Sequence, residues 1–203
     1  MKIRLLFPII IALIFSSCSE FSGNEDAVEA SLKPAPVTKT TTPSTPKPTY
    51  YDLDAITFGN NTFVAVGVGG AVLTSSDNGT TWDNRTSGTT SQLNEIAYGD
   101  STFVAVGDRG TNIYSSDNGA TWSSGTTTET SNYDGVANGS NVFAAVGNVN
   151  ILRSTDSGSN WTTITTANLK DVAFGNSTFV ACGADGAVYE SANGSSWTSR
   201  TSG

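Results

Sequence analysis

The chain of 203 residues contains no histidine, only two cysteines and only one methionine, and 14% of its residues are charged. The absence of histidine excludes most transition-metal sites and the commonest general base. Two cysteines cannot supply the disulfide framework of a small secreted domain. The sequence therefore predicts no metal site and no cofactor, and a fold that depends on its packed core.

Basic residues are also scarce, since 10 Lys and Arg stand against 18 Asp and Glu and give a net charge of −8. A chain cut before Cys18 loses Lys2 and Arg4 and carries two more net negative charges. Nucleic-acid binding requires a basic face, and electrostatic attachment to anionic lipid requires a basic cluster. The composition argues against both functions.

Glycine is abundant, with 21 residues, and serine, threonine and asparagine are frequent. These residues favour turns, and they separate short runs of β-branched and aromatic residues, which favour strands. The chain is therefore expected to be all-β, with many short strands.

The first twenty residues have the organisation of an export signal. Lys2 and Arg4 precede an apolar run over 5–15, which is too short to span a bilayer, and two serines then precede Cys18. This order resembles a bacterial lipoprotein signal. The resemblance implies removal of residues 1–17, lipid modification of Cys18 and an exported protein anchored to a bacterial membrane, on its periplasmic or cell-surface side. An ordinary secretory signal with an incidental Cys18 is the alternative.

The next segment, 18–49, contains every proline of the chain except Pro8, together with many threonines. It has too few apolar residues to fold, and its prolines favour extended conformations. We therefore expect a signal at 1–17, a disordered tether at 18–49 and a folded domain at 50–203.

The domain is one unit written four times, over about 51–89, 90–130, 131–167 and 168–203. Phe63, Phe103, Phe143 and Phe179 lie 40, 40 and 36 residues apart, and Trp82, Trp122, Trp161 and Trp197 lie 40, 39 and 36 apart. Each unit offers four strand-length pieces, which in the first are 53–58, 62–67, 71–75 and 80–86.

The second piece of each unit reads FVAV or a close variant, with apolar residues at consecutive positions. Such a strand is covered on both faces, as happens when sheets stack on sheets. The sequence predicts a β-propeller of four four-stranded blades. A β-solenoid is the alternative, disfavoured because its rungs are shorter. The four blades either close into a small ring or form a half-ring completed by a homodimer.

An eight-residue turn, S-x-D-x-G-x-T-W in its full form, ends the third piece of each unit. Its aspartate can accept backbone N–H groups, its glycine supplies a positive φ, and its tryptophan can pack between blades. The positions are Ser75, Asp77, Gly79, Trp82; Ser115, Asp117, Gly119, Trp122; Ser154, Asp156, Gly158, Trp161; and Gly194 and Trp197. The fourth copy aligns Glu190 and Ala192 with the serine and aspartate, and Asn193 is a candidate substitute acceptor.

The turn resembles the Asp box of bacterial neuraminidase-type repeats, which implies a structural role in a propeller blade. The whole repeat of 51–203 resembles the repeats of the photosystem II assembly and stability factor family. That family's photosynthetic members resemble one another in having more blades and an arginine-rich surface, which this sequence lacks. The resemblance therefore implies the type of repeat only.

Catalysis is not expected. Sialidases that resemble these repeats use three arginines, a Tyr–Glu pair and an acidic proton donor. Here Arg85, Arg109, Arg153 and Arg200 fall at non-equivalent positions of the units, and no Tyr–Glu pair is recognisable. Asp54, Asp134 and Asp171 near the blade starts leave a glycosidase carboxylate pair open. A degenerate sialidase-like glycoside hydrolase is therefore retained as an alternative.

Cys182 occupies the position of Val66, Val106 and Val146 in the other units. Because those valines belong to the apolar strand, Cys182 is expected to be a small buried hydrophobe.

Strand directions place the eight-residue turns on one rim, and the blade connections and the turns after FVAVG on the other. The second rim carries variable polar residues: Tyr51, Asp54, Gln92, Asn94, Asp108, Arg109, Asn132, Asp134, Asn148, Asn150, Asn168, Lys170 and Asp185. Their carboxylates, amides and tyrosine suit a glycan or a protein loop, although a merely solvated rim has the same composition.

The sequence thus predicts a membrane-anchored, non-enzymatic binding module for a glycan or a protein of the cell envelope. A further alternative is an assembly or stability factor for an envelope or membrane complex.

Overall fold

The computed structural model describes residues 52–202, so the predicted signal, Cys18, the tether and Tyr51 lie outside the described residues. The described part forms sixteen strands and three short 3₁₀ segments. None of its helices has the length and apolarity needed to cross a membrane.

The strands form four antiparallel sheets of four consecutive strands each, which we call blades 1 to 4. Blade 1 contains β1 (Leu53–Gly59), β2 (Thr62–Gly67), β3 (Val72–Ser75) and β4 (Asp83–Arg85). Blade 2 contains β5 (Leu93–Gly99), β6 (Thr102–Gly107), β7 (Asn112–Ser115) and β8 (Ser123–Ser124). Blade 3 contains β9 (Tyr133–Gly139), β10 (Val142–Gly147), β11 (Asn150–Ser154) and β12 (Thr162–Thr166). Blade 4 contains β13 (Leu169–Gly175), β14 (Thr178–Gly183), β15 (Val188–Ser191) and β16 (Thr198–Arg200). The 3₁₀ segments are η1 (Val68–Gly70), η2 (Asp108–Gly110) and η3 (Ala184–Gly186).

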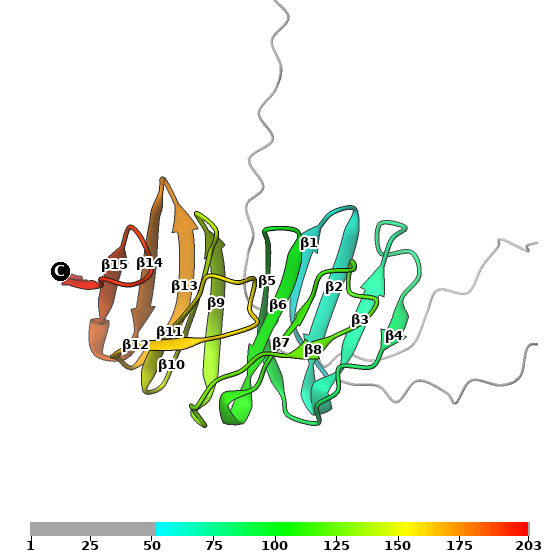
Figure 1. Cartoon of the computed structure of the whole chain (residues 1–203), viewed down its shortest axis with the longest axis horizontal. Coiled ribbons are helices and arrows are strands. Elements are labelled where there is room, and N and C mark those ends of the chain that lie inside the picture. Colours follow the sequence, from blue (N-terminus) through cyan, green and yellow to red (C-terminus); the bar gives the residue numbers. More distant parts are fainter. Residues whose placement is uncertain (1–51, 203) are drawn as a thin grey trace, which may run out of the picture. The chain divides into compact units, whose positions relative to one another are not determined.

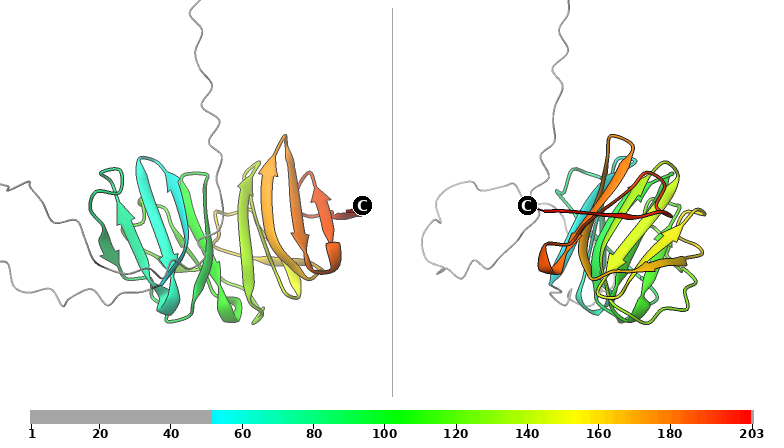
Figure 2. Two further views of the ribbon diagram at one scale, coloured as in Figure 1. Left: turned by 180° about the vertical axis from the view of Figure 1, so that it is seen from behind. Right: turned by 90° about the vertical axis from the view of Figure 1, so that its left-hand side faces the viewer.

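The blades follow one another as in a propeller, which confirms the predicted all-β fold of four four-stranded blades. The first strands β1, β5, β9 and β13 lie next to one another in that order (Figures 1 and 2). Within residues 52–202, no packing of similar extent joins β13 to β1. Blades 1 and 4 are therefore the two ends of the array, as Figure 1 shows.

The core consists of apolar clusters at the junctions between successive blades. Between blades 1 and 2, for example, Val64 and Val66 pack with Leu93, Ile96 and Phe103. Similar clusters lie between blades 2 and 3 and between blades 3 and 4. Full burial of one such side chain contributes about 1.5–3 kcal/mol, so each junction contributes several of these increments.

The FVAV-type strands of the two middle blades, β6 and β10, are buried along their whole length. In blade 4 the corresponding strand β14 alternates, because Phe179 and Ala181 are buried against blade 3 while Val180 and Cys182 are exposed. The prediction that Cys182 is buried is therefore wrong. Its valine equivalents are covered by the next blade, and no next blade covers this face of blade 4 within the described residues.

The eight-residue turns, which we call Asp turns, join the third strand of each blade to the fourth. In blade 2, buried Ser115 donates from Oγ to Asp117 Oδ1 at 2.8 Å and accepts the N–H of Gly119 at 2.9 Å. Thr121 donates its N–H to Asp117 Oδ1 at 2.9 Å and its hydroxyl to Oδ2 at 2.6 Å. These bonds from Thr121 and Ser115 lower the pKa of Asp117 to about 2. The Trp122 indole donates to the Gly119 carbonyl at 3.0 Å.

In the fourth copy, Ser191 and Asn193 take the roles of the serine and the aspartate, and not Glu190 and Ala192. Ser191 pairs with Phe179 just as Ser75 pairs with Phe63, and its Oγ accepts the N–H of Gly194 at 2.9 Å. Asn193 Oδ1 accepts the N–H groups of Ser195 and Ser196 at 2.9 and 3.0 Å. The alignment failed because this turn is one residue shorter than the others.

Replacement of the Ser115 hydroxyl tests this turn. Ser115→Ala leaves the buried N–H of Gly119 without its acceptor, which is expected to lower the free energy of unfolding by about 1–3 kcal/mol. Urea denaturation followed by tryptophan fluorescence measures the change. The exposed neighbour Ser116 provides the matched control, and equal destabilisation by Ser116→Ala would contradict the assignment.

Candidate functional site

The two rims of the array carry different loops. Each blade's first strand starts, and its second strand ends, at the rim that also carries η1, η2, η3 and the blade-to-blade connections. We call this the connection rim, and it carries most of the predicted binding residues. The Asp turns lie on the opposite rim, which we call the Asp-turn rim.

On the connection rim, several predicted side chains bind across blade boundaries. Gln92 Nε2 of blade 2 donates to Asp54 Oδ2 of blade 1 at 3.1 Å. Asn94 Nδ2 donates to the Tyr133 carbonyl of blade 3 at 2.9 Å and to Asp108 Oδ1 of its own blade at 3.2 Å. These bonds tie the starts of blades 1, 2 and 3 into a single polar strip.

The strip continues towards blade 4. Asn132 Oδ1 accepts the backbone N–H of Arg109 at 3.0 Å, which joins η2 to the connection that leads into blade 3. Lys170 Nζ of blade 4 donates to Asp134 Oδ2 at 2.8 Å and to Asn148 Oδ1 at 2.6 Å, both in blade 3.

The other predicted residues of this rim fall into three groups. Asp185 is exposed in η3, and Asn168 is exposed just before β13. Asn150 is buried and donates to Glu129 Oε2 at 2.6 Å, so it fastens the connection between blades 2 and 3 to β11. Tyr51 lies outside the described residues. The structure therefore brings most of the predicted set into one strip. Asn150 is buried and is not accessible to a partner.

Sequence reasoning missed Glu95, which lies on β5 next to the register shift that follows Leu93. Burial raises the pKa of Glu95 to about 7; a hydrogen bond from the Ile96 amide opposes this shift, and the negative charge of Asp171 adds to it. Asp171 occupies the matching position of β13 and accepts the N–H of Val172 at 2.7 Å. Two carboxyl groups thus lie where inner strands start, close to the connection rim.

A titration of stability tests the environment of Glu95. Because its folded pKa lies above the unfolded value, its contribution to stability is present below pH about 4.5 and is lost as the pH rises through 7. Glu95→Gln is therefore expected to flatten the fall in stability across this window and to be the more stable form at pH 8, by on the order of 1–3 kcal/mol. Urea denaturation at a series of pH values measures the effect.

Asp185→Asn removes one carboxylate from an exposed position of the same rim and controls for the change in net charge. The same pH profile in wild type and Glu95→Gln would show that Glu95 ionises normally.

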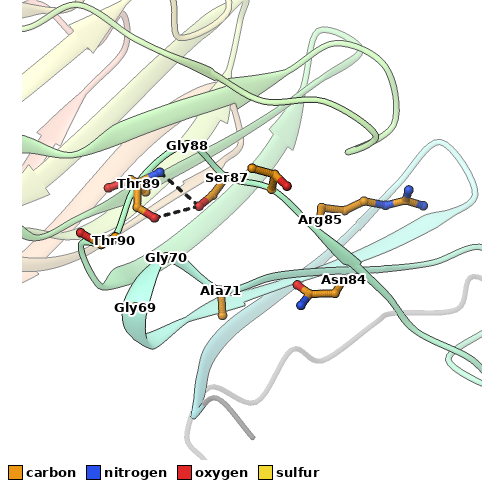
Figure 3. Close-up of a pocket in the computed structure, with 10 residues that line it drawn as sticks. Gly69, Gly70, Ala71, Asn84, Arg85, Ser87, Gly88, Thr89 and Thr90 are labelled. Atoms are coloured by element: carbon orange, nitrogen blue, oxygen red, sulfur yellow. Dashed lines mark hydrogen bonds between the residues drawn. The ribbon is translucent and has the colours of Figure 1, made fainter. Parts of the chain in front are cut away.

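A pocket of about 530 Å³ lies in blade 1 between η1 and the connection to blade 2 (Figure 3). Its lining residues are Gly69, Gly70, Ala71, Asn84, Arg85, Thr86, Ser87, Gly88, Thr89 and Thr90. The connection is held by Ser87, whose Oγ accepts the N–H of Thr89 at 3.3 Å and donates to its carbonyl at 3.2 Å. Arg85 bonds to Thr74 and Asp83, so its guanidinium is already engaged. The pocket offers hydroxyl and backbone groups for hydrogen bonds at the outer end of the rim.

No protein-family model and no curated protein matches this chain. Solved structures match it over most of the propeller. YCF48 bound to D1 peptide is 21% identical with a TM-score of 0.60, and the match covers 76% of this chain and 54% of that one. The GH74 enzyme of Niastella koreensis is 22% identical with a TM-score of 0.56, covering 74% of this chain and 24% of the enzyme. The nidogen/laminin complex gives 13% identity and a TM-score of 0.59, with 74% and 65% covered.

This chain spans about half the length of YCF48, which is a photosystem II assembly factor. That match agrees with the resemblance of the repeats in the sequence, and at this level of identity it shows the fold alone. The same fold thus occurs in an assembly factor, a glycoside hydrolase and a complex of two proteins.

Proposed function

We propose that this propeller is a non-enzymatic binding module that holds a segment of a protein partner on its connection rim. The observation that carries the proposal is the polar strip that runs from Asp54 to Lys170 across all four blades. Its side chains are ordered by bonds to neighbouring blades while they stay wholly or partly exposed. Such preordered polar groups bind a partner at low entropic cost.

Charge indicates the chemistry of the partner. Four of the 18 acidic residues and five of the 10 basic residues precede Asp52, so the propeller carries fourteen acidic and five basic side chains. On the connection rim Asp54 and Asp185 are exposed carboxylates, and Glu95 and Asp171 lie close by. A peptide segment that contains lysine or arginine complements this surface, and its association slows as salt increases.

The solved neighbours support a protein partner. YCF48 was solved with a D1 peptide, and nidogen was solved in complex with laminin. The GH74 enzyme supports the alternative of a glycan ligand, because the fold itself does not determine the ligand.

The positions of the arginines support binding without catalysis. Arg153 donates to the Asn193 carbonyl at 3.1 Å, and Arg200 pairs with Glu190, so each is engaged at a separate place. Arg109 lies in η2 on the connection rim, and Arg85 lies in β4 of blade 1. Four arginines on different blades, each with different neighbours, do not make the convergent carboxylate clamp of a sialidase-like site.

The proposal includes the cellular location of the protein. The signal-like residues 1–17 and Cys18 support an exported protein anchored by lipid, and the segment 18–49 would separate the propeller from the membrane. The partner is then a component of the cell envelope, and a role in assembling an envelope complex is the form of this function closest to that of YCF48.

Peptide binding to variants that lack two rim carboxylates tests the proposal. Panning a library of peptides displayed on phage against the 203-residue chain is expected to enrich basic sequences. Asp54→Asn combined with Asp134→Asn keeps the side-chain shape but removes two negative charges, and it is expected to weaken these peptides at least tenfold, about 1.4 kcal/mol. Fluorescence anisotropy at two salt concentrations measures the affinities.

Asp83→Asn combined with Asp100→Asn removes the same charge from exposed positions outside the connection rim and should leave the affinity unchanged. Equal losses in both double variants would show nonspecific attraction instead of a rim site. Saturable binding on a glycan array without peptide enrichment would replace the protein partner by a sugar.

A further inference from the structure

The two ends of the blade array expose faces that are buried everywhere else in it. At one end, blade 1 exposes Leu53, Ile56 and Phe58, with 43%, 56% and 52% of their surfaces accessible. Their equivalents in blade 2 are Leu93 and Ile96, which are buried, and the half-buried Tyr98. At the other end, blade 4 exposes Val180 and Cys182, whose equivalents Val64 and Val66 are wholly buried in blade 1.

The faces at the two ends are of complementary kinds. At each internal junction, the face that carries the Leu93 and Ile96 positions packs onto the face that carries the Val64 and Val66 positions of the preceding blade. The uncovered face of blade 1 carries the equivalents of Leu93 and Ile96. The uncovered face of blade 4 carries the equivalents of Val64 and Val66. A blade 4 followed by a blade 1 would therefore repeat a junction that this chain already makes three times.

A glycine at the end of each first strand shows this fit in detail. A Cβ atom at Gly59 would collide with the ring of Tyr98, and one at Gly139 would collide with the ring of Phe174. Each glycine thus leaves room for a side chain of the following blade. Gly175 is the fourth such glycine, and no described atom lies where its Cβ would be. The residue that fits this place by repeat position is Phe58.

Polar groups at both rims also match across the missing junction. On the Asp-turn rim, Asn60 Nδ2 donates to Asn118 Oδ1 of the next blade at 2.7 Å, and the equivalent pair would be Asn176 with Asn78. All four of these asparagines have a positive φ, so their backbones already match. On the connection rim, Asp134 binds Lys170 at the same position of adjacent blades, and the new junction would place Asp54 next to Lys170.

We propose that blade 4 of one chain packs onto blade 1 of a second copy, so that two chains close one ring of eight blades with two-fold symmetry. Within a single chain these faces lie at opposite ends of the array (Figure 1). A second copy supplies both missing faces at once, and eight blades is within the range of known propellers. The interface uses the flat faces of the end blades, and the strip residues Asp54 and Lys170 meet at its edge; it is inferred from these faces and does not rest on the rim function proposed above.

Engineered thiols test this junction directly. The background is the full chain with Cys18→Ser and Cys182→Val, which removes both native thiols and restores at 182 the valine of the other repeats. Phe58→Cys is introduced into one preparation and Gly175→Cys into another, and both are oxidised in mild detergent, alone and mixed. We expect a disulfide-linked pair of chains only in the mixture, because residue 58 faces residue 175 and not its own copy.

The other outcomes overturn the proposal. If neither the mixture nor a variant that carries both Phe58→Cys and Gly175→Cys gives a disulfide, the two faces do not meet. If the mixture gives none while the variant with both cysteines forms a disulfide within one chain, the ring closes with four blades. A disulfide in the Phe58→Cys preparation alone would show that two copies of blade 1 pair face to face.

A matched pair of charge substitutions gives an independent measurement. Phe58→Asp introduces a charge into the proposed junction and is expected to convert the dimer to a monomer in sedimentation experiments across micromolar concentrations. Val149→Asp changes a side chain of similar exposure, 48%, between β10 and β11 of blade 3 and should leave the dimer intact. Near-ultraviolet circular dichroism confirms that both variants are folded. A wild type that sediments as a monomer at every concentration would rule out the ring.

Discussion

Every blade depends on apolar contact with a neighbouring sheet. A four-stranded sheet of this size has two faces, and the consecutive apolar residues of its second strand point alternately to each. Val104 and Val106 of β6 pack towards blade 3, whereas Phe103 and Ala105 pack towards blade 1. One strand therefore contributes to two separate clusters. Removing a blade exposes the faces of both its neighbours. The stability of each sheet therefore depends on its contacts with the neighbouring sheets.

The Asp turns serve this stacking. The serine, the aspartate and the glycine satisfy each other's hydrogen bonds locally, so the turn keeps one shape wherever the repeat places it. The turn glycines also lie against the preceding blade, since a Cβ at Gly119 would press on Thr74 and Val64, and one at Gly158 would press on Val104. In the described part of the chain, the connection rim has no side-chain motif that repeats in every blade as the Asp turn does. Its residues vary between blades and are free to carry the chemistry of recognition.

The sequence predicted the features that repeat, and it failed where a residue's surroundings break the repeat. The periodicity of phenylalanine and tryptophan predicted four blades, and the FVAV runs predicted strands covered on both faces, which holds in blades 2 and 3. Cys182 was misjudged because the inference assumed a neighbour that blade 4 lacks in the described part. The role of Ser191 was missed because a one-residue deletion is resolved only by the pairing with Phe179.

The candidate site was predictable to a similar extent. Strand direction alone predicted which variable residues share a rim, because alternate antiparallel strands must end at the same edge. The bonds between those residues depend on the spacing of adjacent blades, which no local pattern encodes. The same applies to Glu95, whose raised pKa depends on its burial and on the negative charge of Asp171 from another blade.

The unpaired end faces connect stability with assembly. Partly exposed Leu53, Ile56 and Phe58 leave apolar surface in water that a folded protein normally covers. Burying it in a junction between chains links folding to concentration, so the apparent stability of the propeller should rise with the amount of protein. If lipid holds the chain on a membrane surface, as proposed above, its local concentration is high and the equilibrium shifts towards the ring. The same ring would carry two connection rims in fixed relation, and a partner with two binding segments would then bind with avidity that one chain lacks.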